Sequence, residues 1–235
     1  MWNKGLSYRE RHGLGLAGMN KGINTNVDDT LHTDTNASKH SLGLVFFPAF
    51  DWKISETHPE RQERLLYTRD QIVEEGLLDI PNIVEYNPIA ADWDTIERVH
   101  VGAPDLESWV TEAHRVSAGG AIAAADAVMR GEVDRAFALV RPPGHHAMSM
   151  VHGIRGFCTI NIEAVMIQHM RQTYGIKRVA VVDTDVHHGD GSQDVFYHDP
   201  DTLYISFHQD GRTLYPGTGL SLIHISEPTR RSYIS

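Results

Sequence analysis

The sequence has little cysteine, no long apolar run and no excess of basic residues. With Cys158 as its single cysteine among 235 residues, the chain cannot form an internal disulfide, which is typical of proteins from reducing compartments. The N-terminal stretch MWNKGLSYRERHGLGLAGMN lacks the apolar core of a signal peptide, and no apolar run reaches the length of a membrane span. These absences predict a cytoplasmic protein with no membrane partner.

The charge balance argues against a nucleic-acid partner. The chain carries 21 basic and 31 acidic residues, a formal net charge of −10, and shows no dense Lys/Arg cluster before its last few residues. Hydrophobic residues make up 41% and charged residues 22%, which is ordinary for one globular domain of this length. Fifteen histidines is a high number, and histidine is a favoured metal ligand and proton carrier.

The first half of the chain predicts two helices. SETHPERQERLLYTRDQIVEEGLL, residues 55–78, has apolar residues at near-helical spacing, with Ser55 or Thr57 as a cap and Pro59 in the first turn. A second helix is predicted over 107–131, with small residues that allow close packing.

The second half predicts strands that alternate with a helix. Short apolar strands are expected at 135–140, 177–183 and 202–207, with a helix over 159–175 that ends at Gly175. This order predicts an α/β fold with a parallel sheet between helices. The histidine-rich loops that follow the first two strands should open at the same edge of the sheet, where such folds bind ligands.

The loop DTDVHHGDG predicts a metal site. Asp185 and His187 are two residues apart on an extended segment, so their side chains can point to one side, as partial ligands of Zn²⁺ or Fe²⁺. Asp183 is also two residues from Asp185, so its side chain can point to the same side. It lies closer to the strand, however, and suits a position behind the metal ligands. The alternative is a polar loop with Asx turns, and the density of ionisable groups favours the metal.

The loop RPPGHHA predicts a proton-handling pair. Two prolines and a glycine restrict the backbone before His145 and His146, whose side chains diverge too far to share a metal easily. The two histidines are better suited to two different proton-transfer tasks at one site. Each imidazole would need a carboxylate behind it to set its tautomer, and Asp183 and Asp190 are the candidates. The alternative is a pair of surface histidines.

Three further residues have two possible explanations each. Cys158, in GFC, is a nucleophile or a small buried residue, and its place before an apolar helix favours burial. Phe157 and Tyr215 either wall a substrate channel or pack in the core.

The series RPPGHHA, GFC, VDTDVHHGDGSQ, ISFHQDG and YPGTG, in this order, resembles the histone deacetylase and acetylpolyamine amidohydrolase superfamily, most closely its bacterial, class II-like members. The resemblance implies an arginase-like three-layer α/β fold with a central, mainly parallel sheet flanked by helices. It also implies removal of acetyl groups from amines through a metal-bound water.

The resemblance assigns roles residue by residue. Asp185 and His187 resemble two of three metal ligands. His145 and His146 resemble paired general acid and base residues, with Asp183 behind His145 and Asp190 behind His146. The residues implied for the substrate channel are Gly156, Phe157 and Tyr215, and those implied for a structural K⁺ are Asp183, Asp185, His187, Ser206 and Phe207.

The C-terminal part of the family pattern has no counterpart in the sequence. The third ligand, an aspartate, and a glycine-rich tyrosine loop are expected well beyond PGTG, where this chain reads LSLIHISEPTRRSYIS. We therefore predict a polar lead-in over 1–41, an N-terminal portion of a deacetylase domain over 42–219, and a tail over 220–235 that is foreign to the family. A fragment with two of three ligands should bind metal weakly and show little activity.

Two other functions stay open at this stage. A metallophosphoesterase also uses Asp-x-His and Gly-Asp motifs, and a non-enzymatic module could keep the fold and bind acetylated tails. The sequence does not distinguish acetyl-lysine peptides from acetylpolyamines as substrates, Zn²⁺ from Fe²⁺, or a monomer from a homo-oligomer.

Overall fold

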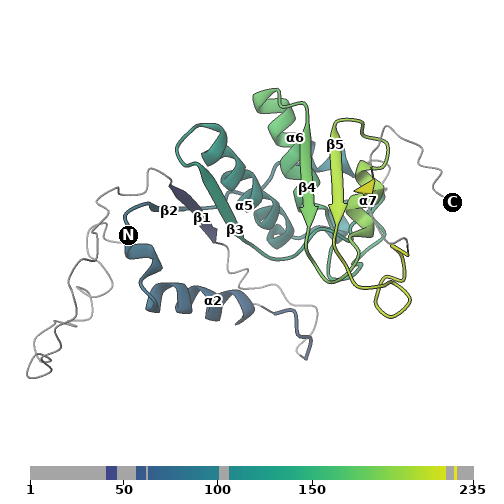
Figure 1. The fold of residues 1–235 in the computed structure, drawn as a ribbon, viewed down its shortest axis with the longest axis horizontal. Coiled ribbons are helices and arrows are strands. Elements are labelled where there is room, and N and C mark those ends of the chain that lie inside the picture. The colour runs from purple at the N-terminus through teal and green to yellow at the C-terminus, as the bar shows by residue number, and fades with distance from the viewer. Residues whose placement is uncertain (1–40, 47–56, 62, 101–105, 221–224, 227–235) are drawn as a thin grey trace, which may run out of the picture.

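A computed structural model of the chain describes residues 41–46, 57–61, 63–100, 106–220 and 225–226 (Figure 1). Apart from Ser41, the predicted lead-in lies outside the described residues. The proposed helix cap Ser55 and most of the predicted tail also lie outside them.

The strands form two groups in which the main pairings are parallel. One group has the order β2-β1-β3, and in the other β4 pairs parallel to β5. The short β6 pairs antiparallel to β5. The strands are β1 (Leu42–Phe46), β2 (Ile83–Tyr86), β3 (Arg135–Leu139), β4 (Val179–Asp183), β5 (Thr202–Ser206) and β6 (Ile225–Ser226). The predicted strands correspond to β3, β4 and β5, whereas the sequence analysis did not predict the other three.

Helices pack against these strands and complete an α/β fold, as predicted. In Figure 1, α5 and α6 lie beside each other next to the strands of both groups. The helices are α2 (Glu63–Glu74), α3 (Trp93–Val99), α4 (Leu106–Trp109), α5 (Glu112–Met129), α6 (Ile162–Tyr174), α7 (Asp190–Phe196) and the 3₁₀ turn η1 (Leu77–Asp79).

The small residues of α5 allow the close packing that the sequence indicated. A Cβ at Gly119 would lie 1.5 Å from the backbone oxygen of Ile89, and one at Gly120 would lie 2.5 Å from Cγ1 of Val140. The helix therefore approaches its neighbours more closely than any larger residue permits. Buried residues of α5 pack with those of α3, α6 and β5 in one apolar core, which includes Ile96, Ile160 and Val165.

The predicted start of the first helix was wrong. The helix begins at Glu63, and Thr57 and Pro59 lie before it in a turn and an irregular segment. The reason is a tertiary contact, because the buried carboxylate of Glu60 is ion-paired with both Arg64 and Arg141. That pairing holds the segment against the loop that follows β3.

The predicted helix over 107–131 is in fact two helices. It is interrupted between α4 and α5, where Thr111 caps α5 and exchanges hydrogen bonds with His114 in a capping box. By contrast, α6 ends as predicted, with Gly175 in the left-handed conformation at φ 66°.

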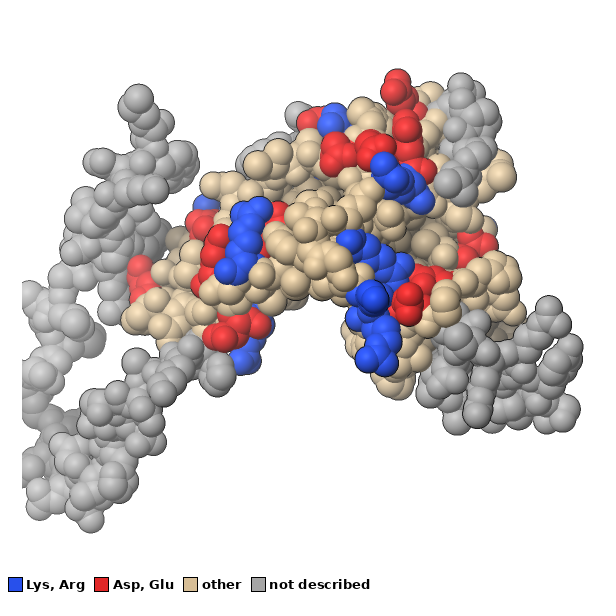
Figure 2. Space-filling model, turned by 90° about the horizontal axis from the view of Figure 1, so that it is seen from above, with Lys and Arg blue, Asp and Glu red and all other residues tan. Residues whose placement is uncertain are grey.

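Charges of both signs are distributed over the surface. Figure 2 shows acidic and basic side chains interspersed across one face of the molecule, without a large patch of one sign. Among the described residues, no helix is both long enough and apolar enough to cross a membrane.

Candidate active site

Two histidine–aspartate pairs meet where β3 and β4 end. Nδ1 of His145, in the loop after β3, lies 3.0 Å from Oδ2 of Asp183 at the end of β4. Nδ1 of His146 lies 2.8 Å from Oδ1 of Asp190, the first residue of α7. The two imidazole rings have centroids 4.0 Å apart. The structure therefore brings the two histidine-rich loops together at one edge of the strands.

Three helices hold the loop that carries the histidines. From α5, the hydroxyl of Ser117 donates to the backbone oxygen of Pro142 at 2.7 Å. From α7, the backbone N–H of Ser192 donates to the backbone oxygen of His145 at 3.0 Å. The side-chain amide of Asn161, which caps α6, donates to the backbone oxygen of Ala147 at 3.3 Å. These long-range bonds fix the loop as a rigid platform.

The two histidines have pKa values shifted in opposite directions. Burial by itself lowers the pKa of His145, but the hydrogen bond and the charge of Asp183 outweigh burial and raise it. For His146, burial dominates and the nearby His145 adds to it, so the pKa of His146 is lowered despite Asp190. His145 therefore keeps its proton up to a higher pH than His146 does.

Both carboxylates behind the histidines stay ionised. Burial alone would raise the pKa of Asp183 and Asp190, but the hydrogen bonds and positive charges around each carboxylate together outweigh burial and hold both pKa values below the usual range. Tyr204 also donates to Oδ2 of Asp183 at 2.8 Å. Each carboxylate can thus fix the tautomer of the imidazole that it contacts.

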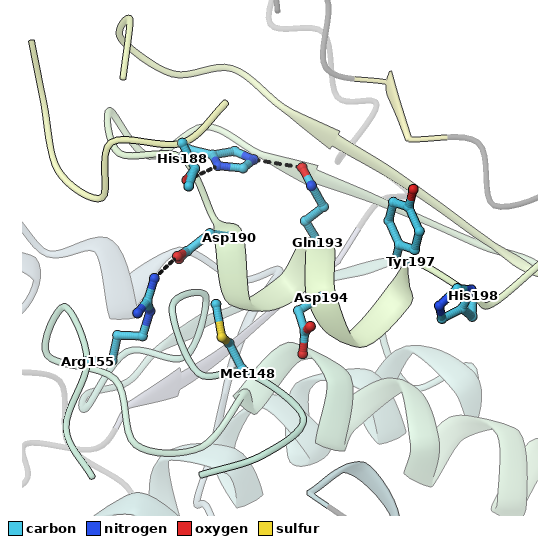
Figure 3. Close-up of a pocket in the computed structure, with 9 residues that line it drawn as sticks. Met148, Arg155, His188, Asp190, Gln193, Asp194, Tyr197 and His198 are labelled. Carbon is cyan, nitrogen blue, oxygen red and sulfur yellow. Dashed lines mark hydrogen bonds and ion pairs between the residues drawn. The ribbon is translucent and has the colours of Figure 1, made fainter. Parts of the chain in front are cut away.

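The sequence analysis missed a third partner in this cluster. The guanidinium of Arg155 forms a hydrogen-bonded ion pair with Oδ2 of Asp190 (Figure 3). It is an additional reason for the low pKa of Asp190. No spacing or motif signals this pair, because it joins a turn before α6 to the start of α7.

The predicted metal ligands lie side by side. Oδ1 of Asp185 is 2.9 Å from Nδ1 of His187, and both side chains are partly exposed. An oxygen and a nitrogen donor suit Zn²⁺ or Fe²⁺, so the two residues fit two positions of such an ion. Within the described part of the chain, no group of three or more His, Cys, Asp or Glu side chains is arranged to hold a metal.

Asx turns stiffen the same loop. The backbone N–H of Asp185 donates to Oδ1 of Asp183 at 3.0 Å, and that of His187 donates to Oδ1 of Asp185 at 2.8 Å. The expected Asx turns are therefore confirmed, and they place the two donors on one side, whereas the metal stays a prediction.

The residues suggested for K⁺ lie close together on adjacent strands. Asp183 pairs with Ser206 in the β4–β5 register, and the N–H of Phe207 donates to the backbone oxygen of Asp183 at 2.9 Å. Together with Asp185 and His187, these residues surround the end of β4. A cation at this position remains a proposal.

Phe157 and Tyr215 lie at the surface beside the histidines and are not core residues. Phe157 is 38% exposed and Tyr215 46%. The rings of Tyr215 and His146 have centroids 5.0 Å apart, nearly perpendicular. Between them, a Cβ on Gly156 would lie 2.2 Å from Cδ2 of His146, so glycine is required there. A role of these residues in a substrate channel stays a prediction.

His58 contacts Phe157, although the sequence analysis did not consider it. Its ring lies edge-on to Phe157, with centroids 4.6 Å apart. It comes from the segment that Glu60 anchors, so the N-terminal segment contributes to this surface.

Two groups below the site are buried. Cys158 has no exposed surface, and burial raises the pKa of its thiol, which confirms that it is a buried residue and not an activated nucleophile. Oε2 of Glu163, in the first turn of α6, is buried without a hydrogen-bond partner among the described residues. Burial raises the pKa of that carboxyl group.

His188, which had no assigned role, holds a turn in place. Its Nδ1 lies 2.8 Å from Oγ1 of Thr218 and its Nε2 2.9 Å from Oε1 of Gln193. Figure 3 shows His188 directed toward α7 at the side of a pocket. That pocket is lined by Met148, Arg155, His188, Asp190, Gln193, Asp194, Tyr197, His198 and Thr218.

Comparison with known proteins identifies the domain. Residues 105–228 match the model of the histone deacetylase domain, more than half of the chain. A protein named probable deacetylase from Archaeoglobus fulgidus is 40% identical over 196 residues, which cover 75% of this chain and 53% of the relative. Polyamine deacetylase HDAC10 of Mus musculus is 46% identical over 173 residues, covering 74% of this chain and 21% of that protein.

A solved structure agrees with this result. The HD domain of HDA15 superposes with a TM-score of 0.66 at 30% identity, over 76% of this chain and 57% of that chain. The chain spans about half the length of the archaeal relative. The order of its motifs, its α/β architecture and these matches lead to one conclusion: the chain belongs to the histone deacetylase family.

Proposed function

We propose that this chain carries a catalytic site for hydrolysis of N-acetylated amines. One observation carries the proposal: two imidazole–carboxylate pairs lie side by side with pKa values shifted in opposite directions, next to Asp185 and His187. Pairs of titratable groups whose environments separate their pKa values are typical of acid–base sites. Membership of the deacetylase family supports the same chemistry and argues against a phosphoesterase.

His146 is the proposed general base. Asp190 accepts a hydrogen bond from its Nδ1, which leaves Nε2 of the neutral ring to take a proton from the attacking water. His145 is the proposed electrostatic partner, because the protonated ring held by Asp183 stabilises negative charge that develops on the former acetyl carbonyl oxygen. Either histidine can then return a proton to the leaving amine.

Asp185 and His187 are the proposed ligands of Zn²⁺, with Fe²⁺ as the alternative. When bound, such an ion lowers the pKa of water and polarises a carbonyl group. Catalytic zinc sites usually have three protein ligands, and we propose that this chain supplies two of them. We propose K⁺ as the structural ion at the end of β4, near Asp183 and Ser206.

The proposed substrate is an acetylated amine on a slender chain. Phe157 and Tyr215 supply apolar rings that would flank a methylene stem, and Gly156 leaves room between them. An acetyl-lysine peptide and an acetylpolyamine both have such a stem. The relatives' names, probable deacetylase and polyamine deacetylase, support the class without choosing between the two.

The test is an acetate-release assay with added Zn²⁺, on an acetyl-lysine peptide and on an acetylated polyamine. Turnover that a chelator abolishes, and that His146→Gln lowers by about 100-fold or more, is expected from loss of a general base. His169→Gln is the matched control, because His169 forms the same kind of pair with Asp126 at 2.8 Å, between α6 and α5. Binding of the acetylated peptide without turnover at any zinc concentration would instead favour a non-enzymatic module.

A further inference from the structure

We infer that Arg155 is a positioning residue, which holds the channel wall and the His146–Asp190 pair in one fixed arrangement. The inference rests on the proposed function, in which His146 handles the proton and Phe157 flanks the substrate. It concerns a residue outside every motif that identified the family.

Both oxygens of the Asp190 carboxylate are used. Oδ1 lies 2.8 Å from Nδ1 of His146, and Oδ2 pairs with the guanidinium of Arg155. Figure 3 shows Arg155 directed at Asp190 at the start of α7. Rotation of the carboxylate would break both contacts, so the guanidinium restricts the orientation in which Asp190 meets the imidazole.

The environment of the carboxylate makes this ion pair more than an ordinary surface contact. Exposed ion pairs contribute little, because water and salt screen them. Here the side chain of Asp190 is only 5% exposed, whereas that of Arg155 is 42% exposed. The Asp190 end of the pair is therefore shielded from water. If Arg155 were removed, the carboxylate would still be buried, but one of its compensating contacts would be lost.

Arg155 also closes the turn that presents Phe157. Its backbone N–H donates to the oxygen of Cys158, and its own oxygen accepts from the N–H of Cys158, both at 2.8 Å. The two residues enclosed are left-handed, with φ 52° at Gly156 and φ 72° at Phe157. A left-handed phenylalanine is unfavourable, and such conformations persist only where surrounding contacts determine them.

One residue thus connects two parts of the site. The backbone of Arg155 defines the turn with Phe157, and its side chain anchors that turn to Asp190. Loss of the guanidinium should free the wall and the proton-handling histidine together.

The test compares Arg155→Met, Arg155→Lys and the unaltered full chain by NMR with ¹⁵N-labelled histidine. The Nδ1–H proton of His146, assigned through its loss in His146→Gln, should exchange with water about 10-fold faster in Arg155→Met, because local opening becomes easier. Arg155→Lys should restore slow exchange, since it keeps the cation. Arg171→Met is the matched control: it removes a comparable pair, Arg171 NH1 to Asp199 at 2.6 Å, far from the turn.

A parallel assay of acetate release should show a lower kcat by about 10-fold and a higher KM for Arg155→Met, in line with losses seen when supporting residues are removed. Unchanged exchange at His146 in Arg155→Met, or an equal change in Arg171→Met, would overturn the inference. Absence of turnover by the unaltered chain would count against the proposed function, while the NMR comparison would still decide the role of Arg155.

Discussion

Nδ1 of His146 lies 2.8 Å from Oδ1 of Asp190, although 44 residues separate them. The contact joins the loop after β3 to the first residue of α7, across the carboxyl end of β4. Because β3 and β4 belong to different strand groups, the contact depends on how the two groups pack as well as on the position of each loop after its strand. The same geometry accounts for the second pair, His145 and Asp183, and explains why residues remote in sequence can form one site.

Zinc should bind this chain weakly. Two protein donors supply about half of a four-ligand site, so we expect a Kd weaker than about 1 μM. Competition with a chelating dye measures it. His187→Ala should abolish the remaining affinity, whereas His198→Ala, at an exposed histidine, should not change it. A Kd in the low nanomolar range for this chain would contradict a two-ligand site.

Replacement of the buried Glu60 should destabilise the protein. Glu60→Gln keeps the shape but leaves Arg141 and Arg64 without their carboxylate. Breaking a buried pair costs about 3–5 kcal/mol, and the partial exposure of both arginines reduces the expected loss to about 2 kcal/mol. Urea unfolding measures the change. Asp94→Asn, which breaks the exposed pair with Arg98, should cost less than about 0.5 kcal/mol.

Stability should fall on acidification because of two buried histidines. Burial lowers the pKa of His100 and that of His114 from 6.5 to about 4. Between pH 6.5 and about pH 4, these histidines bind protons in the unfolded chain but not in the folded chain. The free energy of unfolding therefore decreases as the pH falls through this range. At pH 5 the loss is roughly 2 kcal/mol for each histidine.

The variant His100→Gln isolates one of these contributions. Nδ1 of His100 lies 2.9 Å from the backbone oxygen of Met148, and its Nε2 accepts the N–H of Asn161, so a neutral amide can replace both bonds. Urea unfolding at pH 7 and pH 5 should show a shallower pH dependence in the variant. The raised pKa of His145 gives a pH dependence of stability with the opposite sign. This contribution is the same in both proteins and therefore cancels when they are compared. An unchanged slope would show that His100 is not neutral in the folded protein.

A side chain at Gly156 should block the channel. In Gly156→Ala the new Cβ would lie 2.2 Å from Cδ2 of His146 and 2.9 Å from Cε1 of Tyr215. We expect a loss of acetyl-peptide affinity of at least about 10-fold, since overpacking of this kind costs 1–3 kcal/mol. Gly131→Ala is the control: it has a similar φ of 69° and no atom within 4 Å of the new Cβ. Equal effects in the two variants would assign the loss to backbone strain alone.

Cys158 should resist modification in the folded protein. Its thiol is buried and its pKa is raised by burial, so the reactive thiolate is scarce and inaccessible. At pH 8 an alkylating reagent should react at least about 100-fold more slowly with the folded chain than with the chain in urea. Rapid stoichiometric modification without loss of structure would contradict the burial.

Local sequence patterns were sufficient for much of the fold. The apolar runs of β3, β4 and β5 and the end of α6 at Gly175 follow from periodicity and from the left-handed preference of glycine. The same patterns did not identify β1, although it is as long as β3, or the start of α2. That helix begins at Glu63 because an ion pair from a distant loop holds the preceding segment.

The division is similar at the site. The sequence by itself determined the family and the chemical types present, because the ordered motifs contain the histidines and aspartates of the site. Only the tertiary structure decided what His188 contacts, and that Arg155 and Glu60 support the two histidine loops. These are pairings between loops far apart in sequence, and their partners depend on how the chain packs and not on any local spacing.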